Sequence, residues 1–373
     1  MNASKLVGLA LLASLALPAA ATAQDITIAI AGPLTGSEAV SGRQMTDGAA
    51  LAVADINAAG GVLGRKLKFT VHDDACDPKQ ARSVAEKLAG AKVPFVAGHF
   101  CSASSIAASE VYADANIAQI SPASTATKFT ESRLWNVARV CGRDDQQGPA
   151  AAAYIIKAFA GRNVAVLNDK NTYGKGLADE TRKALNAAGF REKMFESYNR
   201  GEVDFSALVS RMKREHIDLV YVGGYPQEAG LILRQMREQG LKTVLMAGDA
   251  LYDRAFASIT GPDADGALFT FGADPRNNPA AKTVVDRFLA NKVDPEGYTL
   301  HTYAAIQVWA QAVAKVGTTD ARKVMPAVKA GEWDTVMGRL SFDAKGDIKQ
   351  TGYILWKWDS KGNAVELVPG KGS

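Results

Sequence analysis

Small hydroxyl side chains gather at two places where an apolar, strand-like run gives way to a helix-like segment. Residues 98–105 follow the run 93–97 and contain Ser102, and residues 120–125 follow the next run and end in Thr125. The first backbone N–H groups of a helix have no partner within the helix, so hydroxyls beside them can hold a carboxylate without lysine or arginine. The alternative is that these hydroxyls only cap their helices, and the pattern alone favours neither interpretation.

The spacings that mark common enzyme sites do not occur in this sequence. There is no Gly-x-Ser-x-Gly elbow and no Walker-type glycine loop, and residues 174–176 lack the third glycine of a dinucleotide-binding turn. Asp73 and Asp74 are adjacent on a predicted strand and would point to opposite faces, so a shared metal ion is not expected. The four histidines are scattered without metal-like spacing: His72, His99, His216 and His301. We therefore expect no catalytic residue, metal site, cofactor or enzyme activity, and keep a secreted hydrolase as an alternative.

Short, continuous apolar runs rich in β-branched residues recur along the chain and predict strands. They span residues 26–31, 67–71, 93–97, 164–167, 219–222 and 244–247. Runs that do not alternate with polar residues are typical of strands buried on both faces, as in a parallel sheet.

Segments with helical periodicity lie between these runs. Asp77 and Asp204 are each placed to cap the start of a helix, and Gly240 to end one. Asp144 and Asp145 also start a predicted helix, where carboxylates interact favourably with the helix dipole. The alternation of strands and helices predicts the α/β class.

Two series of alternating elements, residues 25–139 and 147–271, predict two open Rossmann-like lobes that face each other across a cleft. The tail after residue 274 contains predicted helices at 280–289 and 298–316 and two late strands near Arg339 and Tyr353, and it could return to complete the first lobe. We predict a signal peptide at 1–23, one lobe at 24–143 plus 273–352, and the other at 144–272 plus 353–373. The segments that cross between the lobes would act as hinges.

The first residues have the pattern of a secretory signal peptide. Lys5 precedes the apolar run 6–17, Pro18 breaks that run, and residues 21–23 form a small-x-small site with cleavage expected after Ala23. The run is shorter than the roughly 20 apolar residues of a membrane anchor, and no cysteine lies near the cleavage site for lipidation. We therefore expect the mature chain to be free in the periplasm.

Composition and cysteine usage fit an exported globular protein. The chain is 47% hydrophobic with a formal net charge of +4, and no basic stripe alternates with aromatic residues, so nucleic acid is not an expected partner. Cys76 and Cys101 each follow a predicted strand, and a bridge between them would close a loop of about 26 residues. Two buried thiols are the alternative, which an oxidising compartment disfavours. Cys141 is left over and is expected to be buried.

Several segments together resemble the periplasmic leucine/isoleucine/valine-binding proteins of ABC transporters, which have the type I periplasmic binding protein fold. The resemblance covers essentially the whole mature chain in order. Its motifs are Ala54-Asp55-Ile56-Asn57, Asp73-Asp74-Ala75-Cys76-Asp77-Pro78, Gly98-His99-x-Cys101-Ser102, Ser121-Pro122-Ala123-x-Thr125, Tyr173-Gly174-x-Gly176, Tyr221-x-Gly223-Gly224-Tyr225, Asp334-Thr335-Val336-Met337-Gly338 and Phe342-Asp343-x-Lys345-Gly346-Asp347.

The resemblance implies a site for an amino acid zwitterion. It implies that Ser102 and Thr125 hold the ligand α-carboxylate through hydroxyls and backbone N–H groups. The Ala123 carbonyl and the Thr125 hydroxyl would help to bind the α-ammonium group, and an acidic side chain at the position of Asp249 would complete that site.

The resemblance also assigns the walls of the cleft. Tyr173 and Tyr225 would line it from the second lobe, and Tyr298 matches an aromatic residue at the pocket for the ligand side chain. The family disulfide falls on Cys76 and Cys101, and Cys101, beside the carboxylate site, is included among the ligand-binding candidates.

Two departures from the family pattern bear on ligand identity. Asp249 stands where a glutamate is common, which shortens the carboxylate side chain by one methylene, and Ser41 stands where an aromatic residue often packs on the ligand, which is expected to enlarge the pocket. A change of this size is worth about 1–3 kcal/mol and can re-rank related ligands.

The resemblance implies capture of an amino acid, with leucine, isoleucine and valine as first candidates, by closure of the cleft. A monomer would then deliver it to the membrane permease of an ABC transporter. A ligand sensor of the same fold, or a binding protein for another amino acid, an amide or an aromatic acid, is the alternative.

Overall fold

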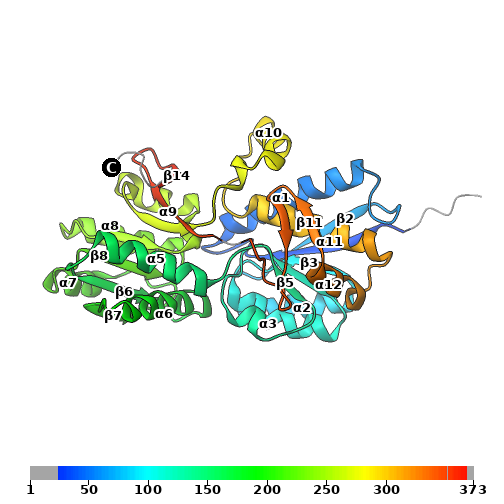
Figure 1. The fold of residues 1–373 in the computed structure, drawn as a ribbon. Coiled ribbons are helices and arrows are strands. Elements are labelled where there is room, and N and C mark those ends of the chain that lie inside the picture. The colour runs from blue at the N-terminus through cyan, green and yellow to red at the C-terminus, as the bar shows by residue number, and fades with distance from the viewer. Residues whose placement is uncertain (1–23, 351, 368–373) are drawn as a thin grey trace, which may run out of the picture.

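The computed structural model describes residues 24–350 and 352–367, and it has two lobes side by side (Figure 1). The predicted signal peptide at 1–23 lies outside the described residues. Within the part of the chain that is described, no helix is both long and apolar enough to cross a bilayer.

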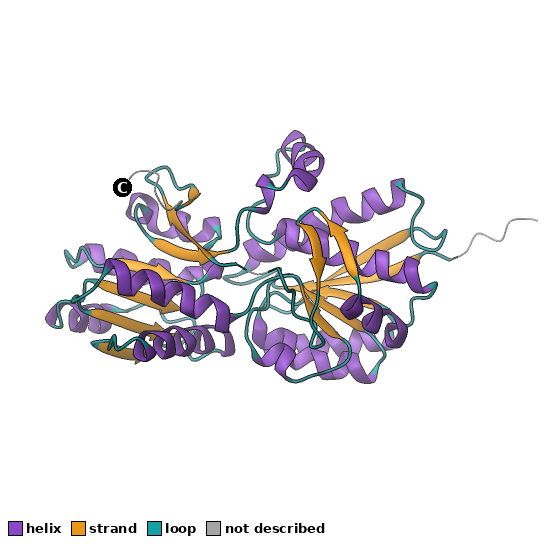
Figure 2. Cartoon of the chain, in the orientation of Figure 1, coloured by secondary structure: helices purple, strands orange, loops and turns teal. Residues whose placement is uncertain are grey.

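A parallel sheet of five strands forms the centre of the first lobe. The strand order is β2-β1-β3-β4-β5, and all neighbouring strands are parallel. The strands are β1 (Ile26–Gly32), β2 (Leu67–Asp73), β3 (Phe95–Gly98), β4 (Ala118–Ser121) and β5 (Val137–Arg139). All residues of β3 and β4 are buried, because helices cover both faces of the sheet (Figure 2).

Helices from both ends of the chain cover this sheet. They are α1 (Ala39–Ala58), α2 (Pro78–Gly90), α3 (Ser102–Asp114), α4 (Lys128–Glu131), α11 (Thr299–Val316) and α12 (Ala321–Ala330). Helix α2 packs on α3, and α1 packs on α11. Trp309 of α11 stacks on Phe95 of β3 with ring centroids 4.8 Å apart. The tail of the chain therefore returns to the first lobe.

The second lobe is built on a seven-stranded sheet with the order β14-β13-β10-β9-β8-β6-β7. Its strands are β6 (Val164–Asn168), β7 (Met194–Ser197), β8 (Leu219–Gly223), β9 (Val244–Ala247), β10 (Leu268–Phe271), β13 (Ile354–Trp358) and β14 (Ala364–Glu366). The five strands β6 to β10 are each parallel to their neighbours among these five. Strand β13 pairs antiparallel with β10, and β14 pairs antiparallel with β13 at one edge of the sheet.

Helices cover the second sheet in the same way, with α5 packed on α6 and α8 packed on α9. They are α5 (Asp144–Ala158), α6 (Thr172–Ala187), α7 (Ser206–Arg214), α8 (Pro226–Glu238) and α9 (Arg254–Thr260). Shorter elements complete the fold: the 3-10 turns η1 (Asp249–Leu251), η2 (Gly261–Ala264), η3 (Pro275–Asn277) and η4 (Pro279–Ala281), helix α10 (Lys282–Ala290), and the hairpin of β11 (Glu332–Thr335) and β12 (Gly338–Ser341).

Two helix-covered sheets, largely parallel, confirm the predicted α/β class with two lobes. The six predicted strands are confirmed, whereas β5, β7, β10, β11 and β14 were not predicted. The chain crosses between the sheets after β5, after β10 and before β13. The first and third crossings are tied together, because Arg143 Nη1 donates a hydrogen bond of 2.6 Å to Asp347 Oδ2. The exact lobe boundaries stay a prediction, which the strand membership supports.

Candidate functional site

The predicted site residues come from the carboxyl ends of strands in both sheets. Ser102 follows β3 and Ala123 follows β4 in the first lobe, while Tyr225 follows β8 and Asp249 follows β9 in the second. Ligands of open α/β sheets bind at this end of the strands. A small cavity between the lobes is lined by Phe100, Ser102, Ala123, Tyr173, Tyr225, Asp249 and Ala250. The structure therefore brings together five of the nine predicted ligand-binding residues around one cavity.

Some hydroxyl groups of the first lobe make hydrogen bonds that hold the fold together, and others have few or no hydrogen-bond partners. Ser121 Oγ donates to the His99 carbonyl at 2.7 Å, and Ser124 Oγ lies 2.7 Å from Ser105 Oγ, so the two strand-to-helix junctions are fastened to each other. Among the described residues, Thr125 Oγ1 is fully buried and has no hydrogen-bond partner. Ser102 Oγ accepts one hydrogen bond, from the Ala126 N–H at 3.2 Å. The local hydrogen bonds therefore account for Ser121 and Ser124, whereas Thr125 lies beside the Asp144 carboxyl and outside the lining of the small cavity.

Asp249 is the acidic residue on the second-lobe side of the small cavity. Its side chain is buried, and its carboxylate accepts hydrogen bonds from the hydroxyls of Tyr173, at 2.9 Å, and Tyr298. Glycine precedes it, and a Cβ on Gly248 would lie 2.7 Å from the Tyr173 hydroxyl and 2.3 Å from Leu177 Cδ2, so a larger residue there would displace these two side chains. The close approach of Tyr173 to Asp249 is thus built into the backbone at the end of β9.

Burial controls the ionisation of the carboxyls in this region. It raises the pKa of Asp249, and the hydrogen bonds from Tyr298 and Tyr173 partly offset that rise. Burial and the nearby charge of Asp249 raise the pKa of Asp144 well above its ordinary value. Neither carboxyl oxygen of Asp144 has a hydrogen-bond partner among the described residues. The favourable helix-start position predicted for Asp144 is confirmed as a position, but the side chain faces the interior rather than water.

Aromatic rings form the apolar walls of the small cavity. The rings of Tyr173 and Tyr225 lie 5.2 Å apart in the second lobe. Phe100 packs edge-on against Tyr298 with centroids 5.6 Å apart. Phe100 is not among the predicted site residues, although it lies within the serine-rich junction at 98–105, two residues before Ser102. Its position immediately after a buried strand is the sequence feature that could have identified it as a site residue.

Ser41 does not line this cavity. Its hydroxyl donates a hydrogen bond of 2.8 Å to Asp253 Oδ2 of the second lobe, and both residues are buried. In this arrangement the serine adds no room for a ligand, contrary to the expectation that it enlarges the pocket, because the carboxylate of the opposite lobe occupies the adjoining space. The volume of the cavity is about 10 Å³, which is close to the room needed for one water molecule.

The predicted disulfide joins Cys76 and Cys101, whose Cα atoms are 5.5 Å apart. It lies beside a buried pair in which Asp74 Oδ2 contacts His99 Nδ1 at 2.5 Å. Asp74 and His99 thus have structural roles, as predicted. Cys101 immediately precedes helix α3 and lies outside the lining of the small cavity. Cys141 is a buried free thiol, as expected, and burial raises its pKa.

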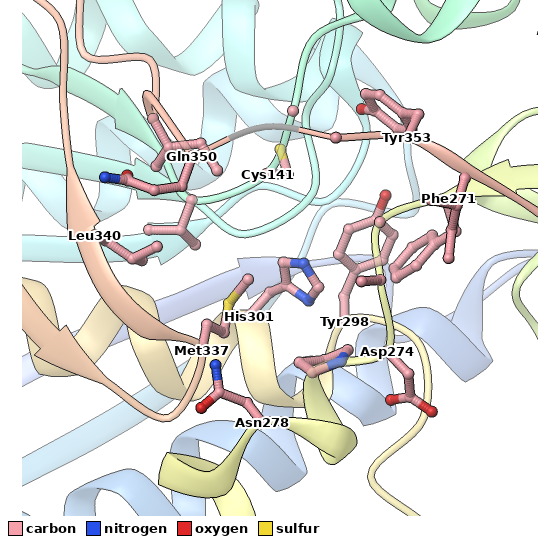
Figure 3. Close-up of a pocket in the computed structure, with 18 of the residues that line it drawn as sticks. Cys141, Phe271, Asp274, Asn278, Tyr298, His301, Met337, Leu340, Gln350 and Tyr353 are labelled. Atoms are coloured by element: carbon pink, nitrogen blue, oxygen red, sulfur yellow. The ribbon is translucent and has the colours of Figure 1, made fainter. Parts of the chain in front are cut away.

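A larger cavity of about 500 Å³ opens near the crossings between the lobes (Figure 3). Cys141, Tyr298, His301 and Tyr353 are among its lining residues, and Tyr298 is its link to Asp249. Its other walls include apolar side chains of the first lobe, such as Met337 (Figure 3). We place the candidate ligand site in the smaller cavity, because Ser102 of the first lobe and the buried carboxylate of Asp249 of the second lobe both line it. Within the described residues, no group of three or more histidine, cysteine, aspartate or glutamate side chains could hold a metal ion.

Comparison with known proteins identifies the family. Residues 25–363 match the family model described as periplasmic binding protein. Leu/Ile/Val-binding protein homolog 1 of Brucella suis is 48% identical over 353 residues, which are 94% of this chain and 95% of that protein.

Two solved structures share the fold. The leucine binding protein LivK of Thermotoga maritima matches with a TM-score of 0.85 and 26% identity, covering 92% of this chain and 98% of that chain. The branched-chain amino acid transporter substrate binding protein LivJ of Streptococcus pneumoniae, in complex with isoleucine, matches with a TM-score of 0.84 and 25% identity over 92% of this chain and 100% of that chain. The chain therefore belongs to the periplasmic binding protein family.

Proposed function

We propose that this protein captures a zwitterionic amino acid between its lobes and delivers it to the permease of an ABC transporter. The observation that carries the proposal is the pairing of opposite polarity across the small cavity. The Ser102 hydroxyl, at the start of α3, lines it from one lobe, and the buried carboxylate of Asp249 lines it from the other. Such a pair fits a molecule that carries an anionic and a cationic group a few bonds apart.

The first lobe supplies the carboxylate end of the proposed site. Ser102 is the first residue of α3, so the N–H groups of that helix start are directed toward the same place as its hydroxyl. The Ala123 carbonyl and Asp249 are the acceptors for the ammonium group. Tyr173 and Tyr298 hold the Asp249 carboxylate in position through their hydroxyls.

Phe100, Tyr225 and Tyr298 form the apolar side where a ligand side chain would lie. Leucine, isoleucine and valine are the first candidates, because the related proteins are named for them. Alanine and threonine, whose side chains are shorter, belong in the same screen. Because the cavity of about 10 Å³ has the size of one water molecule, any amino acid requires the two lobes, or their lining side chains, to move apart.

Binding proceeds by closure of one lobe on the other about the three crossings. The ligand is released unchanged to the permease, and we propose no enzymatic step. The protein acts in the periplasm as a monomer, and residues 1–23 direct its export. A ligand sensor would use the same site, and reconstitution of uptake with the permease distinguishes the two roles.

The deciding experiment is a thermal-shift screen of refolded, ligand-stripped protein. Amino acids, small amides and aromatic acids are each added at about 1,000 times a micromolar dissociation constant. A true ligand should then add roughly 4 kcal/mol of stability, which raises the melting temperature by several degrees. The proposal predicts a response to aliphatic amino acids and recovery of the intact ligand afterwards. Responses confined to compounds without an ammonium group would refute it.

A further inference from the structure

One arginine of the second lobe reaches across the cleft into the first. Arg200 lies in the turn after β7, and its Nη1 donates hydrogen bonds to the Cys76 carbonyl at 3.3 Å and to Cys76 Sγ at 3.0 Å. Its Nη2 donates to Glu38 Oε1 at 3.0 Å and to Ser37 Oγ at 3.4 Å. One side chain therefore holds both the segment before α1 and the disulfide that precedes α3.

Arg200 is also coupled to a wall of the candidate ligand site. Its guanidinium lies 4.3 Å from the ring centroid of Tyr225, which lines the small cavity. A cation over an aromatic ring is an attractive contact that strengthens when water is excluded. We call the contacts of Arg200 with Glu38, Cys76 and Tyr225 the Arg200 bridge.

The bridge is buried, in contrast to most ion pairs of the chain. The Glu38 side chain is 1% exposed and that of Arg200 is 22% exposed. Arg200 faces two further buried acids of its own lobe, Asp169 and Glu228. Glu38 also faces Asp253 across the cleft. An arginine among acids that are withdrawn from water together makes separation of any one partner costly, because it leaves a buried charge uncompensated.

A second inter-lobe pair offers a comparison. Arg254 of α9 contacts Asp294 at 2.9 Å and Glu296 at 2.8 Å, but its side chain is 51% exposed. Its partner Asp294 is 37% exposed and Glu296 is 12% exposed, so water and salt screen these contacts more than they screen the Arg200 bridge. Arg200 and Arg254 thus both connect the two lobes, but Arg200 is more buried.

We propose that Arg200 is a positioning residue that determines how long the ligand stays bound, because the Arg200 bridge holds the cleft closed and Tyr225 against the ligand. The proposal rests on the proposed function. Contacts that hold the cleft closed over the ligand mainly affect dissociation, whereas the association rate depends on the open cleft.

The test is stopped-flow kinetics, with intrinsic fluorescence as the signal, on R200M, E38Q, the double variant and the control R254M. The ligand is the amino acid that stabilises the wild-type protein most. R200M should raise the dissociation rate at least tenfold and change the association rate less than threefold. E38Q should change the dissociation rate less than R200M does, the double variant should equal R200M, and R254M should stay within twofold of wild type. The melting temperature of each ligand-free variant shows whether it is folded.

Three results would overturn the proposal: an unchanged dissociation rate in R200M, an equal effect in R254M, or additive effects of R200M and E38Q. If the wild-type protein binds no amino acid, the proposed function fails, and the bridge is judged by small-angle X-ray scattering. R200M should then have a larger radius of gyration than R254M and wild type, and an unchanged radius would overturn the proposal.

Discussion

The charge of Asp249 is the feature on which amino acid recognition should depend most. Replacing Asp249 by asparagine keeps the shape and an oxygen acceptor for the hydroxyls of Tyr173 and Tyr298, and removes only the negative charge. Removing one partner of a buried, hydrogen-bonded charge pair costs about 2–5 kcal/mol. Since about 1.4 kcal/mol corresponds to a tenfold change in affinity, the dissociation constant should rise at least about 30-fold. The lower end applies because the amide oxygen still accepts hydrogen bonds.

Calorimetry with two ligands isolates this effect. One ligand is the preferred amino acid, and the other is the same acid without its amino group. In D249N the affinity for the amino acid should fall, while the affinity for the deaminated acid stays the same or improves, because a buried carboxylate no longer lacks a counterion. A dissociation constant within threefold of wild type would falsify the assignment of Asp249. Equal losses for both ligands would show that the substitution had deformed the cleft instead.

Three further outcomes are expected. Replacing Cys76 and Cys101 together by serine should lower stability by roughly 3 kcal/mol, seen as a lower melting temperature with ligand affinity retained, and an unchanged melting curve would argue against the bond. Replacing Ser41 by alanine should weaken ligand binding about fivefold or more in calorimetry, because the buried Asp253 carboxylate loses its 2.8 Å donor; wild-type affinity would show that this contact is absent in solution. Burial raises the pKa of Glu38 from 4.5 to about 7 in this closed arrangement, so its contribution to closure is fully present below about pH 4.5 and is lost as the pH rises through 7. Affinity measured from pH 4.5 to 8 should therefore decline more in the wild type than in E38Q, and parallel profiles would contradict this.

Most of the strands that could be predicted lie inside the sheets, although β2 is an edge strand that was predicted and β10 is an inner strand that was missed. The inner strands are continuous apolar runs, because helices cover them on both sides. Three strands that the sequence did not reveal, β5, β7 and β14, lie at sheet edges. Edge strands are short and tolerate polar residues, as Glu196 in β7 and Arg139 in β5 illustrate. Periodicity carries little information about such segments.

The candidate site was predictable to the extent that its residues follow strands. Ser102 and Thr125 were found because hydroxyls cluster at junctions, which is a local pattern. The contact between Ser41 and Asp253 and the contact between Arg200 and Glu38 join residues more than 160 positions apart on opposite lobes. Their pairing depends on how one lobe closes on the other, and no spacing within a single segment encodes it.

The acids at the interface between the lobes explain why a ligand would drive closure. Closing the cleft withdraws Asp249 and Asp144 from water, and the pKa of each rises because burial disfavours the charged form. An ammonium group placed between the lobes supplies the missing countercharge and lowers the free energy of the ionised, closed state alone. A ligand shifts a conformational equilibrium only by its difference in affinity for the two states. On the proposed function, the cost of burying these carboxylates would therefore penalise closure without a cationic ligand and would couple closure to capture of one.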